Sequence, residues 1–210
     1  MKSQSDHIQD IREIRRLMER SSRFISLSGF SGISAGLFAL IGAGIAHLLL
    51  KSNNIIYDEY YRTLGAGADR SVIGYLMLDA LIVLILALLS AYYFSARKAK
   101  KMNTKFWNPA AKQMIVSLFI PLVTGGLLIL ILLYRTQINF VAPLTLIFYG
   151  LGLINAGKYS GVNINYLGFV EITLGLIAMI FINYGLLFWT IGFGVMHIIY
   201  GLLMHFKYER

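Results

Sequence analysis

Six long apolar runs, separated by short polar segments, dominate the pattern of hydrophobic and polar positions along the chain. Four of these runs cover about residues 24–50, 71–96, 109–134 and 139–156. The last two form one hairpin from Tyr166 to Phe206, which breaks at Asn183-Tyr184-Gly185. About 20 apolar residues in helical conformation cross the hydrocarbon layer of a bilayer. The pattern therefore predicts an all-α, polytopic membrane bundle of six transmembrane helices.

A polar segment precedes the first run and divides the chain into three predicted parts. Residues 1–23 place Ile8, Ile11 and Met18 on one stripe of a helix whose other face is mixed and mostly basic. This pattern favours a cytoplasmic amphipathic helix that lies on the membrane interface, and a regulatory or partner-binding helix is the alternative. Residues 24–206 then form the transmembrane domain, and residues 207–210 form a cytoplasmic tail.

Composition agrees with a membrane location and excludes a soluble enzyme. Hydrophobic residues make up 57% of the chain, charged residues make up 14%, and the mean hydropathy is +0.67. An ordinary soluble domain has roughly a quarter charged residues. The net charge is +9, and the cations responsible for it flank apolar runs instead of forming a nucleic-acid recognition motif. The lipid bilayer is therefore the expected partner, and nucleic acid is not. The chain has no cysteine, which excludes disulfides and thiolate chemistry.

The cations are divided unevenly between the two ends of the predicted spans, and this predicts orientation. One side would carry the lysines and arginines within residues 2–23 and 97–112, Lys158 and the cations of the C-terminus. The other side holds Lys51, Arg62, Arg70 and Arg135. The positive-inside rule then places both termini in the cytoplasm, with the protein in the inner (plasma) membrane of a cell. The first run starts near Phe24 and lacks an Ala-x-Ala cleavage site, so we expect it to act as its own insertion signal.

Small residues mark the expected helix contacts. Gly32 and Gly36 lie on one ridge of the first span, where they allow another helix to approach closely. Packing between spans of one chain is the favoured use of this face, and a homo-oligomer through Gly32 and Gly36 is the other. The remaining glycines expected at helix contacts are Gly126, Gly175 and Gly192. In the third span, Pro121 together with Thr124-Gly125-Gly126 predicts a kink or local unwinding.

The odd-numbered runs share a short motif, which indicates an internal repeat. The motif copies are Ser34-x-Gly36-Leu37, Thr124-x-Gly126-Leu127 and Thr173-x-Gly175-Leu176, and the same alignment pairs Gly29 with Gly168. The even-numbered runs align Gly74, Gly150 and Gly192, which are followed by Asp79, Asn155 and His197. The chain is therefore expected to consist of three hairpins in parallel orientation.

These glycine patterns resemble one known family. Gly175-Leu176 and Gly201-Leu202, within residues 120–206, are similar to the repeats of the HdeD-type family of small bacterial membrane proteins. That resemblance implies six helices and a glycine early in each helix of a hairpin, and it transfers no catalytic residue. The chain also resembles uncharacterised six-span proteins of bacteria.

Two ionisable residues in the last hairpin are the main candidate site. Glu171 and His197 lie in apolar runs, and ionisable groups at membrane depth face protein or water and are often functional. Counted at 1.5 Å per residue, the two lie at depths that allow them to meet. Burial favours their neutral forms and pairing favours their charged forms, so the pair is expected to exchange a proton near neutral pH. A glutamate that only hydrogen-bonds within the helix packing is the equally weighted alternative.

Asp79 and His47 form a second candidate pair nearer the outer side. Metal and haem binding are not expected, because the four candidates lie on four helices at two depths and a metal needs three or four convergent ligands. No phosphate-binding loop or common hydrolase motif occurs, so an enzyme is the less favoured class. The loop over residues 51–70 combines tyrosines with acids and is expected to form an interfacial aromatic belt, and tyrosines that cap a pore or bind a ligand are the alternative.

Two function classes follow from these features. The first is a small-molecule or proton-coupled carrier that uses Glu171 and His197, and it predicts a polar cavity shared with Asp79. The second is a non-catalytic membrane sensor, scaffold or partner subunit, in which the same residues pack dry.

Overall fold

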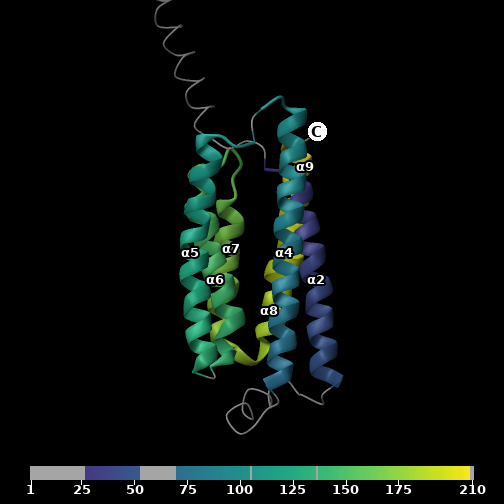
Figure 1. The fold of residues 1–210 in the computed structure, drawn as a ribbon, viewed down its shortest axis with the longest axis vertical. Coiled ribbons are helices and arrows are strands. Elements are labelled where there is room, and N and C mark those ends of the chain that lie inside the picture. The colour runs from purple at the N-terminus through teal and green to yellow at the C-terminus, as the bar shows by residue number, and fades with distance from the viewer. Residues whose placement is uncertain (1–26, 53–69, 105, 136, 209–210) are drawn as a thin grey trace, which may run out of the picture.

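The fold is described from a computed structural model, in which residues 27–52, 70–104, 106–135 and 137–208 are placed. The segment 1–23, with its predicted interfacial helix, and the predicted tyrosine belt within 53–69 lie outside the described residues. Secondary structure in the described ranges is helical throughout. The helices run side by side and alternate in direction along the chain (Figure 1).

Five helical stretches are long and apolar enough to cross a membrane. They are α2 (Gly29–Ser52), α4 (Arg70–Lys101), α5 (Pro109–Tyr134), the 3-10 turn η1 (Ile138–Phe140) with α6 (Val141–Gly157), and the stretch Ile182–Lys207. The sixth predicted span is the shorter apolar helix α7 (Asn165–Ile180). The prediction of an all-α bundle is therefore confirmed, and five of its helical stretches have the length and apolar composition that a membrane span needs.

The last long stretch is a discontinuous helix. It starts with the 3-10 turn η2 (Ile182–Tyr184), continues as α8 (Gly185–Trp189), widens into the π-helix η3 (Thr190–Met196) and ends with α9 (His197–Tyr208). π-Helical segments are rare and often occur at functional sites.

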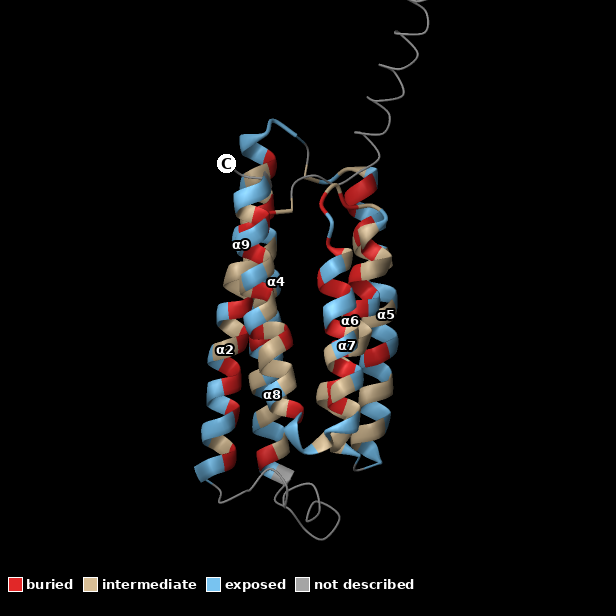
Figure 2. Cartoon of the chain, turned by 180° about the vertical axis from the view of Figure 1, so that it is seen from behind, coloured by how far each residue is buried: buried red, intermediate tan, exposed pale blue. Residues whose placement is uncertain are grey.

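The helices form two groups of three. In one group α2 packs between α4 and α9, and in the other α6 packs between α5 and α7. The two groups are joined by α8 and η3, which contact α6, α7 and α2. Buried positions line the faces between neighbouring helices, whereas most of the outward surface is exposed (Figure 2).

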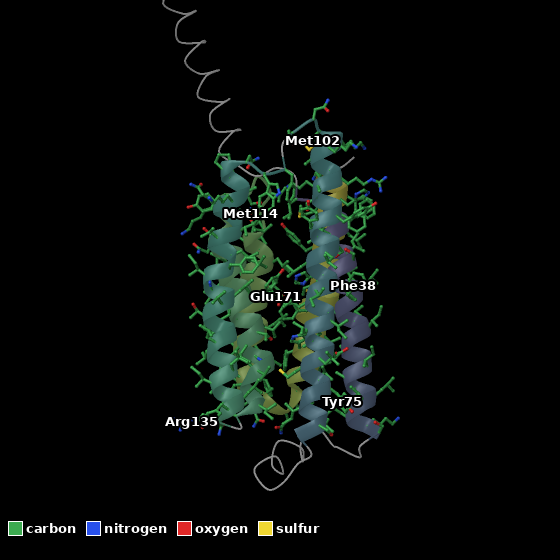
Figure 3. The ribbon with its side chains drawn as sticks, viewed as in Figure 1. Phe38, Tyr75, Met102, Met114, Arg135 and Glu171 are labelled. Atoms are coloured by element: carbon green, nitrogen blue, oxygen red, sulfur yellow. The ribbon has the colours of Figure 1, made fainter. Side chains whose placement is uncertain are left out.

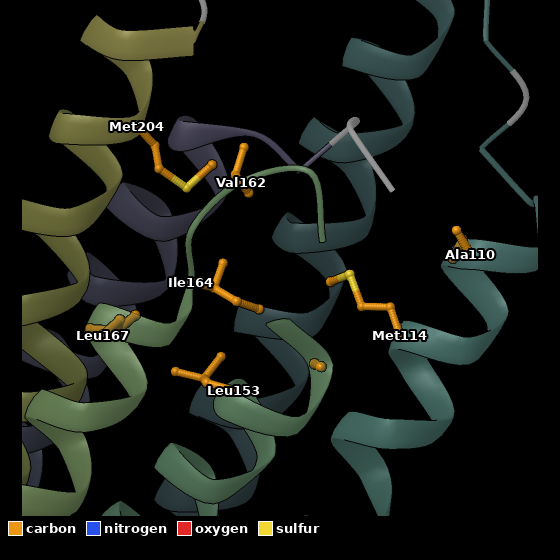
Figure 4. Close-up of a cluster of buried hydrophobic side chains, with 9 residues drawn as sticks. Ala110, Met114, Leu153, Val162, Ile164, Leu167 and Met204 are labelled. Carbon is orange, nitrogen blue, oxygen red and sulfur yellow. The ribbon is translucent and has the colours of Figure 1, made fainter. Parts of the chain in front are cut away.

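Most of the described cations lie at one end of the bundle, which we call the basic end, whereas Lys51, Arg70 and Arg135 lie at the other. The cations of the basic end are Arg97, Lys98, Lys100, Lys101, Lys112, Lys158 and Lys207. A buried apolar cluster at this end joins α5, α6, the following loop, α7 and α9, through Met114, Leu153, Ile164, Leu167 and Met204 among others (Figure 4). The cluster ties the α9 end of one group to the other group.

Glycines bring two pairs of helices into backbone contact. A Cβ at Gly29 of α2 would lie 2.5 Å from the carbonyl oxygen of Gly201, and a Cβ at Gly201 would lie 2.7 Å from that of Gly29. Between α6 and α7, a Cβ at Gly168 would lie 2.8 Å from the carbonyl oxygen of Gly150, and the reverse distance is 2.5 Å. Such distances leave no room for a side chain, so only glycine permits these approaches.

The same register continues two turns further along both pairs. A Cβ at Gly36 would lie 3.0 Å from the backbone nitrogen of Ile198, and a Cβ at Gly175 would lie 3.0 Å from that of Ile147. The α2–α9 pair and the α7–α6 pair thus use corresponding positions. On α2 and α7, the first and fifth predicted spans, these are the positions that the sequence aligned. On their partner helices, Gly150 of α6 corresponds in these contacts to Gly201 of α9 and not to Gly192. The alignment predicted for the fourth and sixth spans therefore differs from the one that the contacts use.

The α-helix of α5 is continuous from Pro109 to Tyr134, so the local unwinding predicted near Pro121 does not occur. Proline has no N–H, which deprives the carbonyl of Ser117 of its usual helical donor. The side-chain nitrogen of Asn155 on α6 donates to this carbonyl at 2.9 Å. A neighbouring helix therefore satisfies the freed group, and the break expected in the third span occurs in the last one instead, at η3.

Candidate functional site

Glu171 of α7 is fully buried, with 0% of its surface exposed. It lies about midway along the helices, between the two groups (Figure 3). It lies one turn after Gly168, on the stretch of α7 that glycine holds close to α6. A Cβ at Gly192 of η3 would lie 2.5 Å from the Oε2 atom of Glu171. The missing side chain of Gly192 therefore provides the space for the carboxyl group.

His197 is the first residue of α9 and follows the π-helix directly. Its Nδ1 atom lies 3.0 Å from the carbonyl oxygen of Gly192 and 3.4 Å from the Oε1 atom of Glu171. Its Nε2 atom lies 2.8 Å from the hydroxyl of Tyr149 on α6. The structure thus brings Glu171 and His197 together, and both ring nitrogens of the histidine have a polar neighbour.

Aromatic rings enclose the histidine. The ring of Tyr149 stacks on His197 with centroids 5.3 Å apart, and the ring of Phe193 stacks on it with centroids 5.8 Å apart. Phe193 in turn contacts Trp189 at 5.1 Å. With 6% of its surface exposed, His197 is held in one orientation by ring contacts and hydrogen bonds.

The carboxyl of Glu171 has an unusual position for a buried acid. Neither of its oxygens has a hydrogen-bond partner within the described part of the chain. A buried carboxylate without hydrogen bonds is costly, and a buried ion pair is stable only when its geometry is good and its other lone pairs are satisfied. The pair is therefore expected to keep no net charge, either as carboxylic acid with neutral imidazole or as carboxylate with imidazolium.

The hydrogen bonds of His197 differ between these two states. In the neutral imidazole with its proton on Nδ1, the ring donates to Gly192 and accepts from Tyr149. In the imidazolium both ring nitrogens carry protons, so Nε2 donates to the hydroxyl oxygen of Tyr149. Gain of a proton at Nε2, the nitrogen that faces Tyr149 and not Glu171, therefore reverses the direction of the hydrogen bond to α6.

Tyr149 is the site residue that the sequence did not indicate. It preceded Gly150 in the expected repeat, and nothing in its spacing linked it to His197. A useful signal was the dipeptide Tyr-Gly, which occurs at Tyr149-Gly150, Tyr184-Gly185 and Tyr200-Gly201. The first and the last of these are the two positions that correspond in the glycine contacts. The π-helix was also missed, although Gly192 and Gly194 lie within it.

The second predicted pair is not brought together. Asp79 is half-buried on α4 and faces α2, where a Cβ at Gly42 would lie 3.3 Å from its Oδ2 atom. His47 lies further along α2 and is exposed. Among the described residues no ion pair links them, and Asp79 does not reach the Glu171 site. No group of three or more potential metal ligands occurs in the described ranges.

The glycines predicted at helix contacts differ in what they face. Gly32, Gly36 and Gly175 pack against neighbouring helices, and Gly192 faces Glu171 and Leu146. A Cβ at Gly126, in contrast, would meet open space. The face of Gly32 and Gly36 is covered by η3 and α9 of the same chain, and a homo-oligomer through this face stays a prediction.

Comparison with known proteins adds no relative. No model of a protein family, no curated protein and no solved structure matches the chain. The resemblance to the HdeD-type family therefore stays a prediction, and function has to be inferred from the site itself.

Proposed function

We propose that the chain is a proton-coupled carrier for a small molecule, with Glu171 and His197 as its proton site. The observation that carries this proposal is the fully buried carboxyl of Glu171, which has no hydrogen-bond partner among the described residues and lies 3.4 Å from Nδ1 of His197. A carboxyl that served packing alone would be expected to hydrogen-bond its surroundings. A carboxyl that takes up and releases a proton needs a partner with which to exchange it.

The discontinuous helix beside the pair supports a carrier. Carriers commonly bind ions and substrates where a membrane helix is interrupted, because the interruption frees backbone groups and allows movement. Here η3 provides Phe193, whose ring stacks on His197, and the Gly192 carbonyl, which accepts a hydrogen bond from His197. We infer that protonation changes the bond between His197 and Tyr149 and thereby the fit between α9 and α6.

The alternative is a proton-responsive sensor or scaffold without transport. It is favoured by the full burial of Glu171 and by the position of Asp79, which faces Gly42 on α2. In this reading the pair changes the stability of the fold with pH, and no substrate passes. The two readings share the proton site and differ in whether a solute crosses the membrane.

Stability against pH tests the proton site. The pair is neutral when it holds one proton, and it becomes a buried anion at high pH and a buried cation at low pH. We expect the stability of the wild type to be greatest between about pH 4.3 and pH 6.5, the ordinary pKa values of glutamate and histidine in an unfolded chain, because the folded and unfolded states then hold the same number of protons. Stability should fall on both sides of this range. Glu171→Gln should lose the alkaline fall and keep the acid one. In the described part of the chain the hydroxyls of Tyr149 and Tyr200 are also titratable and lie near the pair. Tyr149→Phe therefore tests whether the loss of a tyrosine proton causes the alkaline fall, which this variant should retain.

A flat curve for the wild type that coincides with that of Glu171→Gln would contradict a titrating site and remove both readings. If the site titrates, reconstituted vesicles separate the readings. Acidification of the vesicle interior when a candidate solute is added, absent in Glu171→Gln, would support the carrier. Titration without solute-dependent proton movement across a broad panel of solutes would leave the sensor.

We also propose six spans, arranged as three parallel hairpins with both termini in the cytoplasm of a cell whose inner (plasma) membrane holds the protein. The corresponding glycine contacts of α2–α9 and α7–α6 support the repeat, and the basic end supports the orientation. A cysteine at Asn103 should be protected from an impermeant thiol reagent in intact cells, whereas one at Ser52 should react. The chain has no native cysteine to confuse the result, and the opposite labelling would overturn the orientation.

A further inference from the structure

α4 and α5 are the least covered helices of the bundle. The long helices differ in the buried share of their most apolar stretch. This share is 11% in α4 and 6% in α5, whereas it is 33% in α2 and 39% in Ile138–Gly157. α4 packs mainly on α2, and α5 packs mainly on α6. Although they follow each other in the chain, the two share little contact in the described ranges. The outward surface of both helices, with residues such as Leu81, Leu89, Ile120 and Val123, is called the α4–α5 face.

The α4–α5 face has a strong positive charge at the basic end. Arg97, Lys100 and Lys101 are exposed in the last turns of α4, and Lys112 is exposed in the first turn of α5. The described residues contain two acids, Asp79 and Glu171, and both lie inside the helices and away from this end. No described carboxylate therefore balances these cations.

Aromatic side chains mark the level at which this end would meet lipid headgroups. Trp107 is 63% exposed, and Tyr92 and Tyr93 are 55% and 58% exposed. Phe106 connects them, because its ring packs edge-on against Tyr92 and against Trp107, each with centroids 5.3 Å apart. Tryptophan and tyrosine favour the membrane interface because their rings are apolar and their N–H and O–H groups are polar.

We propose that anionic phospholipid binds to the α4–α5 face, with headgroups beside Arg97 and Lys101 of α4 and beside Lys112 of α5, and with acyl chains along the exposed apolar side chains of each helix. The choice of occupant follows from charge. A phosphate-bearing, net negative headgroup complements the cations, whereas a second copy of the chain paired through the same face would bring its own cations against them. The apolar part of the face suits acyl chains, which need no hydrogen bonds.

Trp107 makes this proposal directly measurable. The chain has two tryptophans, and Trp189→Phe leaves Trp107 as the single fluorophore while keeping an aromatic ring beside Phe193. This protein is placed in phosphatidylcholine vesicles with increasing fractions of brominated phosphatidylglycerol or, separately, brominated phosphatidylcholine. Bromine quenches tryptophan only at close range, so quenching reports how often each lipid occupies the site.

We expect brominated phosphatidylglycerol to occupy the site about fivefold or more over its bulk fraction, because each nearby cation favours an anionic lipid several-fold. Lys101→Gln combined with Lys112→Gln should reduce this preference toward one. Lys51→Gln combined with Arg135→Gln, at the opposite end, is the matched control and should leave it unchanged. Elution volume and helical content confirm that each variant is folded.

Equal quenching by the two lipids in the otherwise unaltered protein would overturn the proposal. So would a preference that survives the loss of Lys101 and Lys112, because the cations would then not select the lipid. Weak quenching by both lipids, together with a dimer on the column, would show that a second copy covers the face instead.

Discussion

The α2–α9 pair and the α7–α6 pair are built on corresponding glycine contacts, but they differ one turn after the first glycine. α2 carries Gly32 at that position, and α7 carries Glu171. Gly32 lets the backbones of α2 and α9 approach, because its Cβ would lie 3.1 Å from the Cα atom of Gly201. Glu171 instead directs a carboxyl toward Gly192 and His197. The comparison shows how one packing scheme serves structure in one pair and a polar site in the other.

The largest expected effect comes from filling the shared glycine positions. Gly36→Leu and Gly175→Leu should each destabilise the protein by more than about 3 kcal/mol, because the new side chain meets backbone that cannot move aside. Gly44→Leu and Gly126→Leu are the controls, since a Cβ at either position meets open space. Thermal stability and elution volume measure the result. If Gly36→Leu and Gly175→Leu differed strongly, the two pairs would not be equivalent.

A second prediction concerns the residue by which the two pairs differ. Glu171→Met replaces the buried acid with an apolar side chain of similar size. We expect stability near neutral pH to be unchanged or slightly raised, because the unpaired buried carboxyl is removed and His197 can remain neutral, while proton coupling is lost. Chemical denaturation together with the pH profile provides the measurement. A marked loss of stability would mean that Glu171 serves packing, as Gly32 does.

The contact between Asn155 and α5 tests the α5–α6 side of the comparison. Asn155→Leu should cost about 1–3 kcal/mol, because the carbonyl of Ser117 would stay buried without a donor. Pro121→Ala restores the helical N–H, so the double variant Asn155→Leu/Pro121→Ala should recover much of the loss. No recovery would show that Asn155 acts through some other contact.

The smallest effect is expected at Asp79, the other described acid. Asp79→Asn should change stability by less than about 0.5 kcal/mol, because the side chain is half-buried and has no described ion-pair partner. It should also leave the pH profile of the Glu171 site unaltered. A shift in that profile would couple Asp79 to the pair and revive the expected cavity that contains all three residues.

The apolar runs were sufficient to predict the helices, because the length and hydropathy of a membrane span depend on the local sequence alone. The predicted third span, 109–134, agrees with α5, and the break at Asn183-Tyr184-Gly185 lies where η2 passes into α8. Depth counted along the helices was likewise enough to expect Glu171 beside His197. These properties follow from position along one helix or from the order of two adjacent helices.

Which faces meet between distant helices could not be read from the same pattern. Tyr149 reaches His197 because α6 lies beside η3 and α9, and the apolar positions of α6 point in all directions. The separation of His47 from Asp79 depends in the same way on rotation about the helix axes. The π-helix contains Gly192 and Gly194, which face side chains of α7, α6 and α2, and such contacts with distant helices are not visible in the local sequence. At Pro121, the carbonyl that lacks its helical donor accepts from Asn155 of another helix.

The position of α2 between α4 and α9 has a consequence for biosynthesis. α2 is the first described helix to leave the ribosome, whereas α9, which covers its glycine-rich face, is the last. Translation proceeds at about 5–20 residues per second, so this face stays without its partner for roughly ten seconds or longer. The α6–α7 pair, formed by consecutive helices, has no such delay. Chains that stall before α9 are therefore expected to expose the Gly29, Gly32 and Gly36 ridge to membrane quality control, which makes completion of the last helix the step at which a nascent copy becomes protected.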